Sequence, residues 1–448
     1  LDTLGAITRG QRQTGGQGLF RPEDNLESPY ARDALRQLYR HIYPFWLLGM
    51  LWRLLLSKGS RACGSGRVGA PPVGEPHGLW FHAETPAAVQ TAAPLVYQLM
   101  EGRREGRITF TTGGPEALAM VRALFADAEV VDVTCAPLDL AGPAGRFIRR
   151  LQPRLLVLVE TPTRPNLVRK ARRRGVPVLL LNAIGLPRRG RCERRILKWL
   201  DGVTAVNDQV AEAYRAVVPD PEGVSTTGDI RFDAPTPGGT HHKQAGELRE
   251  AWGDKRPVWL ALDVEPKEAG IVRDTFAGLR GNHPNLLLVL VPAGAGQGHG
   301  VAAPFEDQGY KVVRHGGGDQ AKLDTDVYVI DSARDRPLAC VLGDVAFVGG
   351  TLTGNGHNPA PVAAAGRPMV TGPNLNNVSA VAVALHSVHA LVVVGGPRYL
   401  ADGVEKLLAD RDQAAQLGAA GQQLVTPHAG AMRQALETLS WLAREADE

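Results

Sequence analysis

The sequence lacks the cysteine and histidine groupings that mark metal-binding or disulfide-rich proteins. Its 448 residues include only four cysteines, which are far apart and form no CxxC pair: Cys63, Cys135, Cys192 and Cys340. No group of histidines has the spacing of metal ligands, so no metal site is expected. The cysteines are expected to be reduced thiols in a protein that faces the cytosol. The net charge of +4 is too small for a dedicated nucleic-acid binder, so nucleic acid is not an expected partner.

No apolar run is long enough to span a membrane. The longest, residues 42–56, contains Arg53 and has about 15 residues, whereas a spanning helix needs about 20. Trp46 and Trp52 are aromatic residues of the kind found at membrane interfaces. We favour a helix that lies in the membrane surface, with an anionic membrane surface as partner, over the alternative of a helix docked on the folded domain. No cleavable signal peptide is expected.

The sequence does contain a regular alternation of apolar strands and helices. Runs such as residues 154–160 and 176–182 predict strands of a parallel sheet, and helical segments such as residues 87–100 separate them. A stretch rich in Pro and Gly, residues 217–245, interrupts this alternation, which restarts at residue 257. The pattern predicts an α/β protein of two Rossmann-like domains with a cleft between them, which resembles the GT-B glycosyltransferase architecture.

The domain boundaries follow from the same pattern and from composition. Residues rich in Gly, Gln and Arg at the start of the sequence predict a disordered tail. The predicted parts are the tail at residues 1–28, the membrane-surface helix region at 29–60, an N-terminal Rossmann-like domain at 61–235 and a C-terminal Rossmann-like domain at 236–448. The resemblance to the GT-B architecture implies that the N-terminal domain binds the acceptor and the C-terminal domain the nucleotide-sugar donor.

The most specific signal is residues 347–359, FVGGTLTGNGHNP, in which a predicted buried strand ends in two glycines. Four further segments accompany it in a fixed order: residues 82–96, 160–167, 182–183 and 227–233. Together the five segments resemble the Kdo transferases, which transfer 3-deoxy-D-manno-octulosonic acid (Kdo) from CMP-Kdo to a lipid A precursor in lipopolysaccharide biosynthesis. The resemblance covers roughly residues 35–440.

The resemblance implies an activity, its substrates and a location. It implies a glycosyltransferase that uses no metal or other cofactor, with a CMP-sugar as donor and a lipid A precursor as acceptor. It also implies a peripheral or monotopic protein at the cytoplasmic face of the bacterial inner membrane.

Several positions depart from what the resemblance implies. The general-base Glu of that family falls at Ala88 and its Trp falls at Arg164, while donor-side residues fall at Ala293, Gly294 and Pro361. Glycosyl transfer needs a base for the acceptor hydroxyl and positive charge near the departing CMP. Two functions therefore stay open: an active transferase, and a catalytically weak or inactive relative that acts as a binding or regulatory protein.

Two acids are candidates for the missing base. Glu84 precedes a predicted helix by a few residues, and is either a relocated base or a loop acid favoured by the helix dipole. Glu160 follows a predicted strand, and either acts in the cleft or caps the segment after it.

Substrate-binding residues are predicted around the glycine loop. The backbone of this loop, with His357 and Asn358, is expected to contact the nucleotide or its phosphate. The alternative for His357 is a loop residue that bonds to backbone. Arg231 is either an anion contact near the hinge or a solvated surface residue. The other predicted contacts are Gly228, Gly349, Gly350, Thr351, Gly356 and Asn377.

Overall fold

The computed structural model describes residues 63–445 except 72–77, 103–106, 127, 188–194, 235, 295 and 317–320. The predicted tail, the predicted membrane-surface helix and Cys192 lie outside the described residues. Within the described part of the chain, no helix is both long enough and apolar enough to cross a bilayer.

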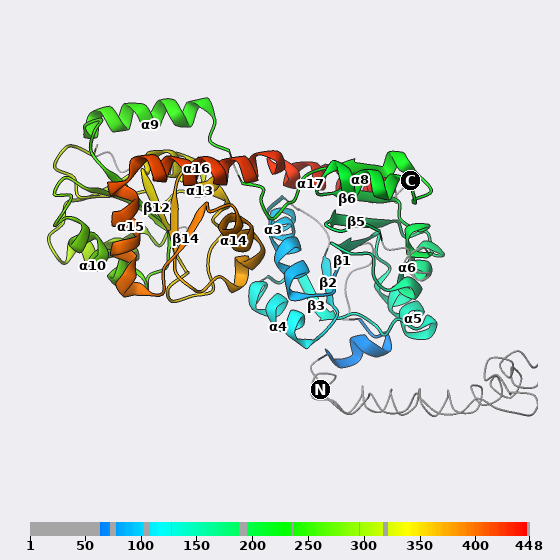
Figure 1. The fold of residues 1–448 in the computed structure, drawn as a ribbon. Helices are drawn as coiled ribbons and strands as arrows, with labels where there is room; N and C mark the ends of the chain where they lie inside the picture. The colour runs from blue at the N-terminus through cyan, green and yellow to red at the C-terminus, as the bar shows by residue number, and fades with distance from the viewer. Residues whose placement is uncertain are drawn as a thin grey trace, which may run out of the picture. The chain divides into compact units, whose positions relative to one another are not determined.

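The first half is a parallel sheet of seven strands with helices on both faces (Figure 1). The strand order is β3-β2-β1-β4-β5-β6-β7. The strands are β1 (Leu79–Ala83), β2 (Ile108–Thr112), β3 (Val131–Cys135), β4 (Leu155–Val159), β5 (Val178–Ala183), β6 (Gly202–Ala205) and β7 (Val224–Thr226). The helices are α3 (Pro86–Gly102), α4 (Pro115–Leu124), α5 (Ala141–Leu151), α6 (Pro165–Arg172) and α8 (Asp208–Arg215), with short 3₁₀ turns η1 (Gly64–Val68) and η2 (Pro221–Gly223).

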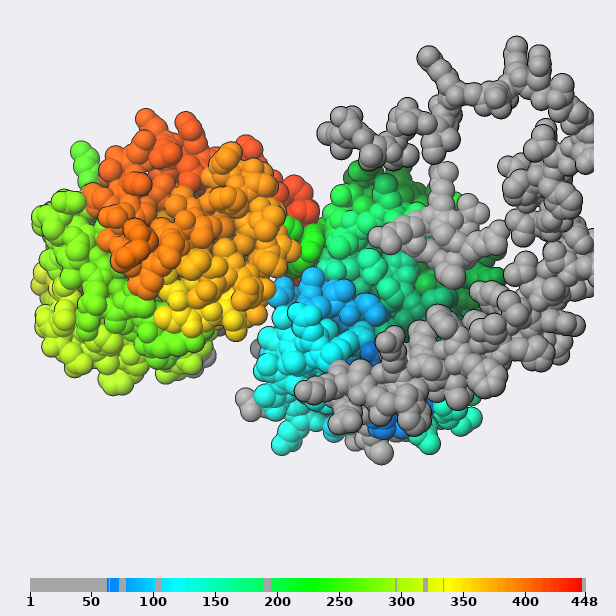
Figure 2. Space-filling model, turned by 60° about the horizontal axis from the view of Figure 1, so that its bottom comes forward, coloured from blue at the N-terminus to red at the C-terminus, as the bar shows by residue number. Residues whose placement is uncertain are grey.

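The second half repeats this plan with strand order β10-β11-β9-β8-β12-β13-β14, again all parallel. Its strands are β8 (Val258–Val264), β9 (Leu287–Pro292), β10 (Val312–Arg314), β11 (Val327–Val329), β12 (Val345–Val348), β13 (Met369–Thr371) and β14 (Leu391–Val393). The helices that follow the chain through this half are α9 (Gly239–Trp252), α10 (Ala269–Leu279), α11 (Gly298–Glu306), α12 (Arg336–Leu342), α13 (Ala360–Ala364), α14 (Ser379–Ser387), α15 (Leu400–Ala409) and α16 (Arg411–Val425). In the space-filling view the residues of each half gather in a body of their own (Figure 2).

Helices cover both faces of each sheet, so the strands between them are apolar along their whole length. In β4, Leu155, Val157 and Val159 pack on one side with α3 and α4, while Leu156 and Leu158 pack on the other with α5 and α6. A parallel sheet covered on both faces needs such strands. The predicted pair of Rossmann-like α/β domains is confirmed.

Several elements escaped the prediction, among them the short strands β6 and β7 and helix α9. The short strands β6 and β7 contain Thr204, Ser225 and Thr226, whose side chains weaken an apolar pattern. Helix α9 buries only Ala245 and Trp252, so its sequence has little helical periodicity.

The predicted end of the C-terminal domain needs correction. The last helix, α17 (Ala431–Glu445), packs in the core of the first sheet through Ala431, Ala435 and Leu439. Asp233 accepts hydrogen bonds from the amides of Gly430 and Met432 at 2.9 and 2.6 Å, which fixes the start of this helix. The chain therefore returns to the first half, and residues 431–445 belong with it.

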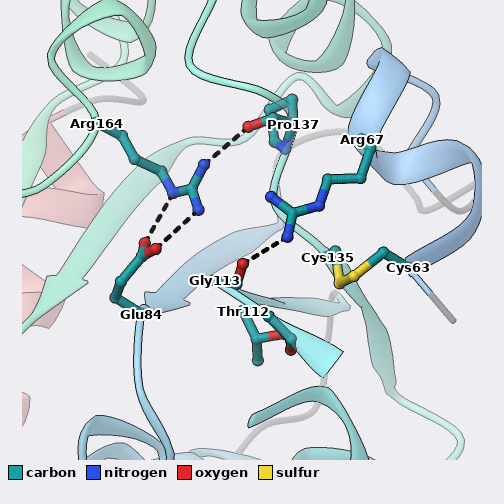
Figure 3. Close-up of a disulfide and its surroundings, with 9 residues drawn as sticks. Cys63, Arg67, Glu84, Thr112, Gly113, Cys135, Pro137 and Arg164 are labelled. Carbon is teal, nitrogen blue, oxygen red and sulfur yellow. Dashed lines mark hydrogen bonds and ion pairs between the residues drawn. A yellow bond between two sulfur atoms is a disulfide. The ribbon is translucent and has the colours of Figure 1, made fainter. Parts of the chain in front are cut away.

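The expectation of four reduced thiols is wrong for one pair. Cys63 and Cys135 form a disulfide that joins the segment before η1 to the end of β3 (Figure 3). The two residues are 72 positions apart, and nothing in that spacing signals a bond. Cys340 is a free, buried thiol.

The disulfide gives a direct prediction. Reduction of the unfolded protein should expose two more reactive thiols than are found without reduction, because Cys63 and Cys135 are bonded to each other. Cys63→Ser should lower the free energy of unfolding by about 2–4 kcal/mol, since the bond restrains the unfolded chain. Cys135→Ser should lower the free energy of unfolding by the same amount. The double variant should lower it no more than either single variant does. Thiol titration and chemical denaturation test this, and four reactive thiols without reduction would contradict it.

Candidate active site

Glu160 is a buried carboxyl group at the carboxyl end of β4. It is 6% exposed and has a left-handed φ of 66°. Its Oε1 accepts a hydrogen bond of 2.6 Å from the Thr91 hydroxyl on α3 and lies 3.7 Å from Arg231 Nη1. Burial raises the pKa of Glu160, and the Thr91 bond and the Arg231 charge only partly oppose that rise. A carboxylate with a raised pKa is a stronger proton acceptor than an ordinary carboxylate, which suits the role of a general base.

Arg231 is held against this acid by a network from neighbouring loops. Its Nε donates to Asp229 at 3.0 Å, and its side chain is only 19% exposed. Asn182, with a φ of 54°, donates from Nδ2 to Asp229 at 3.1 Å and accepts from the amide of Ile230 at 3.0 Å. Arg231 is therefore a partly buried ion-pair residue and not a solvated one.

Glu84 is committed to a different ion pair. Its carboxylate accepts hydrogen bonds from Nε and Nη2 of Arg164 at 2.9 and 3.1 Å, and lies 2.9 Å from His82 Nε2. Burial alone would raise the pKa of Glu84, but the His82 contact and the Arg164 charge bring it down to about 2. A carboxylate with that pKa is a weak proton acceptor. The geometry thus favours a structural role for Glu84 over the predicted relocated base.

Ala88, where the resemblance places a general base, lies in the core. It is 2% exposed and packs with the apolar residues between α3 and the first sheet. Its amide donates to the Thr85 hydroxyl at 3.2 Å at the start of the helix. A carboxylate at this position would be buried among apolar groups, where an unpaired charge is costly.

The glycine loop after β12 is built around a fully buried acid, Glu268. Its carboxylate accepts hydrogen bonds from the amides of Gly350 at 2.5 Å, Leu352 at 2.9 Å and Thr353 at 3.1 Å. The amide of Gly349 donates instead to the carbonyl of Leu262 at 2.7 Å. The amides of these four residues therefore already have hydrogen-bond acceptors within the protein.

The amides of Gly349 and Gly350 therefore have acceptors within the protein, and the predicted contact of the loop backbone with the nucleotide stays a prediction. Both glycines are required for packing: a Cβ on Gly349 would lie 2.3 Å from the carbonyl oxygen of Asp263, and Gly350 has a φ of 68°. The Thr351 hydroxyl donates to Val348 and accepts from Gly372, which ties the loop to β13.

His357 and Asn358 follow this loop. His357 Nε2 lies 3.4 Å from the Glu265 carboxylate, and a third of its side chain is exposed. Asn358 accepts a hydrogen bond from the amide of Ala360 at 3.0 Å, and its Nδ2 lies 3.5 Å from the carbonyl oxygen of Arg231. The structure thus brings Asn358 next to Arg231, while a nucleotide contact by either residue stays a prediction.

The remaining predicted contacts are turn residues. Gly228 and Gly356 have φ values of 88° and 89°, which favour glycine. Asn377 is exposed, and its amide donates to Asn355 at 3.0 Å. Their predicted contacts with substrate stay predictions.

Arg336 at the start of α12 was not predicted as a site residue. Its Nη2 lies 2.7 Å from Asp263 Oδ1 and donates to the carbonyl oxygen of Ala293 at 3.0 Å. Burial raises the pKa of Asp263, and the charges of Arg336 and His357 oppose that rise. Arg336 therefore supplies a positive charge beside the loop where the resemblance expects charged side chains at Ala293 and Gly294. Arg336 could not be recognised from the sequence, because its contact with Ala293 joins residues that are 43 positions apart.

Comparison with known proteins gives the family. The model described as "3-Deoxy-D-manno-octulosonic-acid transferase (kdotransferase)" matches residues 61–234. A second model, described as "C-terminal domain on Strawberry notch homologue", matches residues 1–50, outside the described part.

Full-length relatives agree with the first model. A 3-deoxy-D-manno-octulosonic acid transferase of Haemophilus influenzae is 30% identical over 383 residues, which are 84% of this chain and 88% of that protein. A Bordetella pertussis protein of the same name is 27% identical over 437 residues, with 90% and 99% covered. The C-terminal CMP-Kdo binding domain of WaaA from Acinetobacter baumannii is 23% identical with a TM-score of 0.40, covering 42% of this chain and 98% of that domain. The chain belongs to the Kdo transferase family.

Proposed function

We propose that this protein transfers Kdo from CMP-Kdo to a lipid A precursor in lipopolysaccharide biosynthesis. One observation carries the proposal beyond family membership: a buried carboxyl group, Glu160, has a raised pKa and a guanidinium at 3.7 Å. This is the environment of a group that exchanges protons with substrate. Glu160 would supply the general base in this chain, since Ala88 occupies the position where the family has its general-base Glu.

In the proposed reaction, Glu160 accepts the proton of the acceptor hydroxyl. The acceptor oxygen then forms a bond to the anomeric carbon of Kdo, and the bond between that carbon and the phosphate oxygen breaks. CMP leaves with the electron pair. Arg231 keeps the Glu160 carboxylate available as the anion, and Arg336 offsets negative charge on the leaving phosphate.

The second half would hold the CMP-sugar and the first half the acceptor. That the reaction uses no metal or other cofactor stays a prediction. We also propose that the protein is peripheral at the cytoplasmic face of the inner membrane, since the acceptor is a lipid. Reducing compartments keep most thiols reduced. A cytoplasmic location therefore requires that the Cys63–Cys135 bond forms only under oxidising conditions or resists cellular reductants.

The function is tested by incubating purified full-length protein with CMP-Kdo and tetra-acylated lipid A precursor, followed by mass spectrometry. We expect the acceptor to gain the mass of one or more Kdo units and CMP to be released. A reaction without donor is the control. Absence of any gain would favour the alternative, a catalytically inactive relative that acts as a binding or regulatory protein.

Arg336 gives a separate prediction about the donor. Arg336→Gln should weaken CMP binding by about ten- to a hundredfold, because a charge-assisted hydrogen bond contributes about 1.5–3 kcal/mol. Arg334→Gln, an exposed position two residues away, is the matched control and should bind as the wild type does. Calorimetry with CMP measures both, and equal affinities for all three proteins would remove Arg336 from the donor site.

A further inference from the structure

Two arginines converge at the carboxyl ends of β1, β2 and β3, apart from the Glu160 network. Arg67, on the 3₁₀ turn η1, donates from Nη2 to the carbonyl oxygen of Gly113 at 2.6 Å. Arg164 donates from Nη1 to the carbonyl oxygen of Pro137 at 2.9 Å and forms the ion pair with Glu84. Figure 3 shows the two guanidinium groups extending toward each other from opposite sides, with Glu84 beside one of them.

The charges in this cluster do not balance. Arg67 and Arg164 carry two positive charges against the one negative charge of Glu84, and burial lowers the pKa of His82. Burial also lowers the pKa of Arg67, and the charge of Arg164 lowers it further, against a smaller opposing effect of Glu84. Within the described residues no carboxylate forms an ion pair with Arg67. An excess positive charge in a half-buried position is stabilised by an anion.

The backbone next to the Arg67 contact is open at Gly114. Gly114 precedes α4 and makes no side-chain cap, so the first amides of that ten-residue helix add positive potential. A Cβ placed on Gly114 would meet nothing within 4 Å. Arg67 uses one of the five N–H groups of its guanidinium in the Gly113 bond, which leaves a forked donor for an oxyanion.

Both arginines are held in place by constraints on the backbone that carries them. Arg164 has a left-handed φ of 61°, which is uncommon for a side chain of this kind. The turn that carries Arg67 is fixed at one end by the Cys63–Cys135 disulfide and at the other by Arg146, which donates to the carbonyl oxygen of Val68 at 2.9 Å. The disulfide thus positions Arg67 opposite Arg164.

We propose that Arg67 and Arg164 form a binding site for a phosphate group, and that the Cys63–Cys135 disulfide keeps the site assembled. The site is distinct from Glu160 and Arg336, and does not depend on the proposed transfer reaction. Free phosphate and the phosphomonoester head group of a lipid share this chemistry.

The experiment uses the oxidised full-length protein and two probes. Calorimetry with inorganic phosphate, at ionic strength held constant with sodium chloride, measures the free anion. Flotation with phosphatidylcholine vesicles, with and without phosphatidic acid, measures the lipid head group. Binding of phosphate alone identifies a free-anion site, and binding only of vesicles that contain phosphatidic acid identifies a head-group site.

The variants assign either signal to the two arginines. Arg67→Gln and Arg164→Gln should each weaken binding by about tenfold or more, because each removes a charge-assisted hydrogen bond. Arg122→Gln, at an exposed position in the last turn of α4, is the matched control and should change nothing. Reduction of the disulfide should weaken binding in the wild type but not further in Arg67→Gln.

Two results would overturn the proposal: no binding of either probe to oxidised wild-type protein, or binding that survives both arginine substitutions. Arg164→Gln could fail to fold because Glu84 loses its partner, and Arg164→Lys then replaces it. Lysine keeps the positive charge but lacks the forked guanidinium donor, so this variant should bind phosphate with an affinity between those of the wild type and Arg67→Gln. The transfer assay is run on the same variants, so that a failure of this site is separated from a failure of the proposed function.

Discussion

Replacing Glu160 with glutamine should lower the rate of Kdo transfer by about 10²–10⁴-fold, the usual contribution of a positioned general base. Glutamine keeps the size of the side chain and its bond from Thr91, but cannot accept the acceptor proton. Since the substitution leaves the donor half untouched, CMP affinity should not change. Initial rates at saturating CMP-Kdo, with CMP calorimetry on the same proteins, measure both effects.

The pH dependence distinguishes Glu160 from Glu84. Glu160 must be ionised to act as a base, and burial raises its pKa above the ordinary value. The rate should therefore rise with pH through that raised pKa and then level off. Glu84, with a pKa of about 2, stays ionised over the same range and gives no such rise.

Glu84→Gln is the matched control for Glu160→Gln. It should retain most of the transfer rate and instead lose stability near neutral pH, with the difference from the wild type shrinking as pH falls. A pKa depressed in the folded state means that Glu84 stabilises the protein above the pKa of the unfolded chain, and that this contribution disappears as pH falls toward about 2. A large rate loss in Glu84→Gln with a normal rate in Glu160→Gln would reverse the assignment of the base.

Glu268→Ala should have the largest effect on stability. The substitution leaves the buried amides of Gly350 and Leu352, and the partly buried amide of Thr353, without an acceptor. Each such group costs about 1–3 kcal/mol, so the free energy of unfolding should fall by roughly 5 kcal/mol. Where the variant still folds, the glycine loop should lose its shape and CMP binding should be abolished.

The neighbouring acid Glu265 provides the control. It is paired with the exposed Lys267 at 2.8 Å and caps no buried amide. Glu265→Gln should therefore change stability by no more than about 1 kcal/mol. Urea denaturation of both variants makes the comparison, and equal losses of stability would mean that the Glu268 bonds do not hold the loop.

The sequence was a good guide to the strands and a poor guide to the cross-chain contacts. Strands such as β4 are apolar on both faces, and that property is local. The packing of α17 on the first sheet could not be predicted, because the contacts that hold it, such as those of Asp233 with Gly430 and Met432, join residues far apart in the sequence. The disulfide escaped for a similar reason, since its two cysteines are distant in sequence.

In the candidate site, too, features with a local sequence signal could be predicted, whereas contacts between distant residues could not. Glu160 is a candidate because it ends a recognisable strand, and its role stays a prediction. The bond made by the Gly350 amide could not be predicted, because its acceptor, Glu268, lies 82 residues earlier in the chain. Arg336 was missed because its position beside Ala293 depends on how α12 packs against β9.

The central claim is that an active transferase uses Glu160 as its base. The most direct test is the mass of lipid A precursor after incubation with CMP-Kdo and either wild-type or Glu160→Gln protein, side by side. The wild type should add Kdo within a time in which Glu160→Gln adds none. No gain with the wild type, or the same gain with both proteins, would contradict the account.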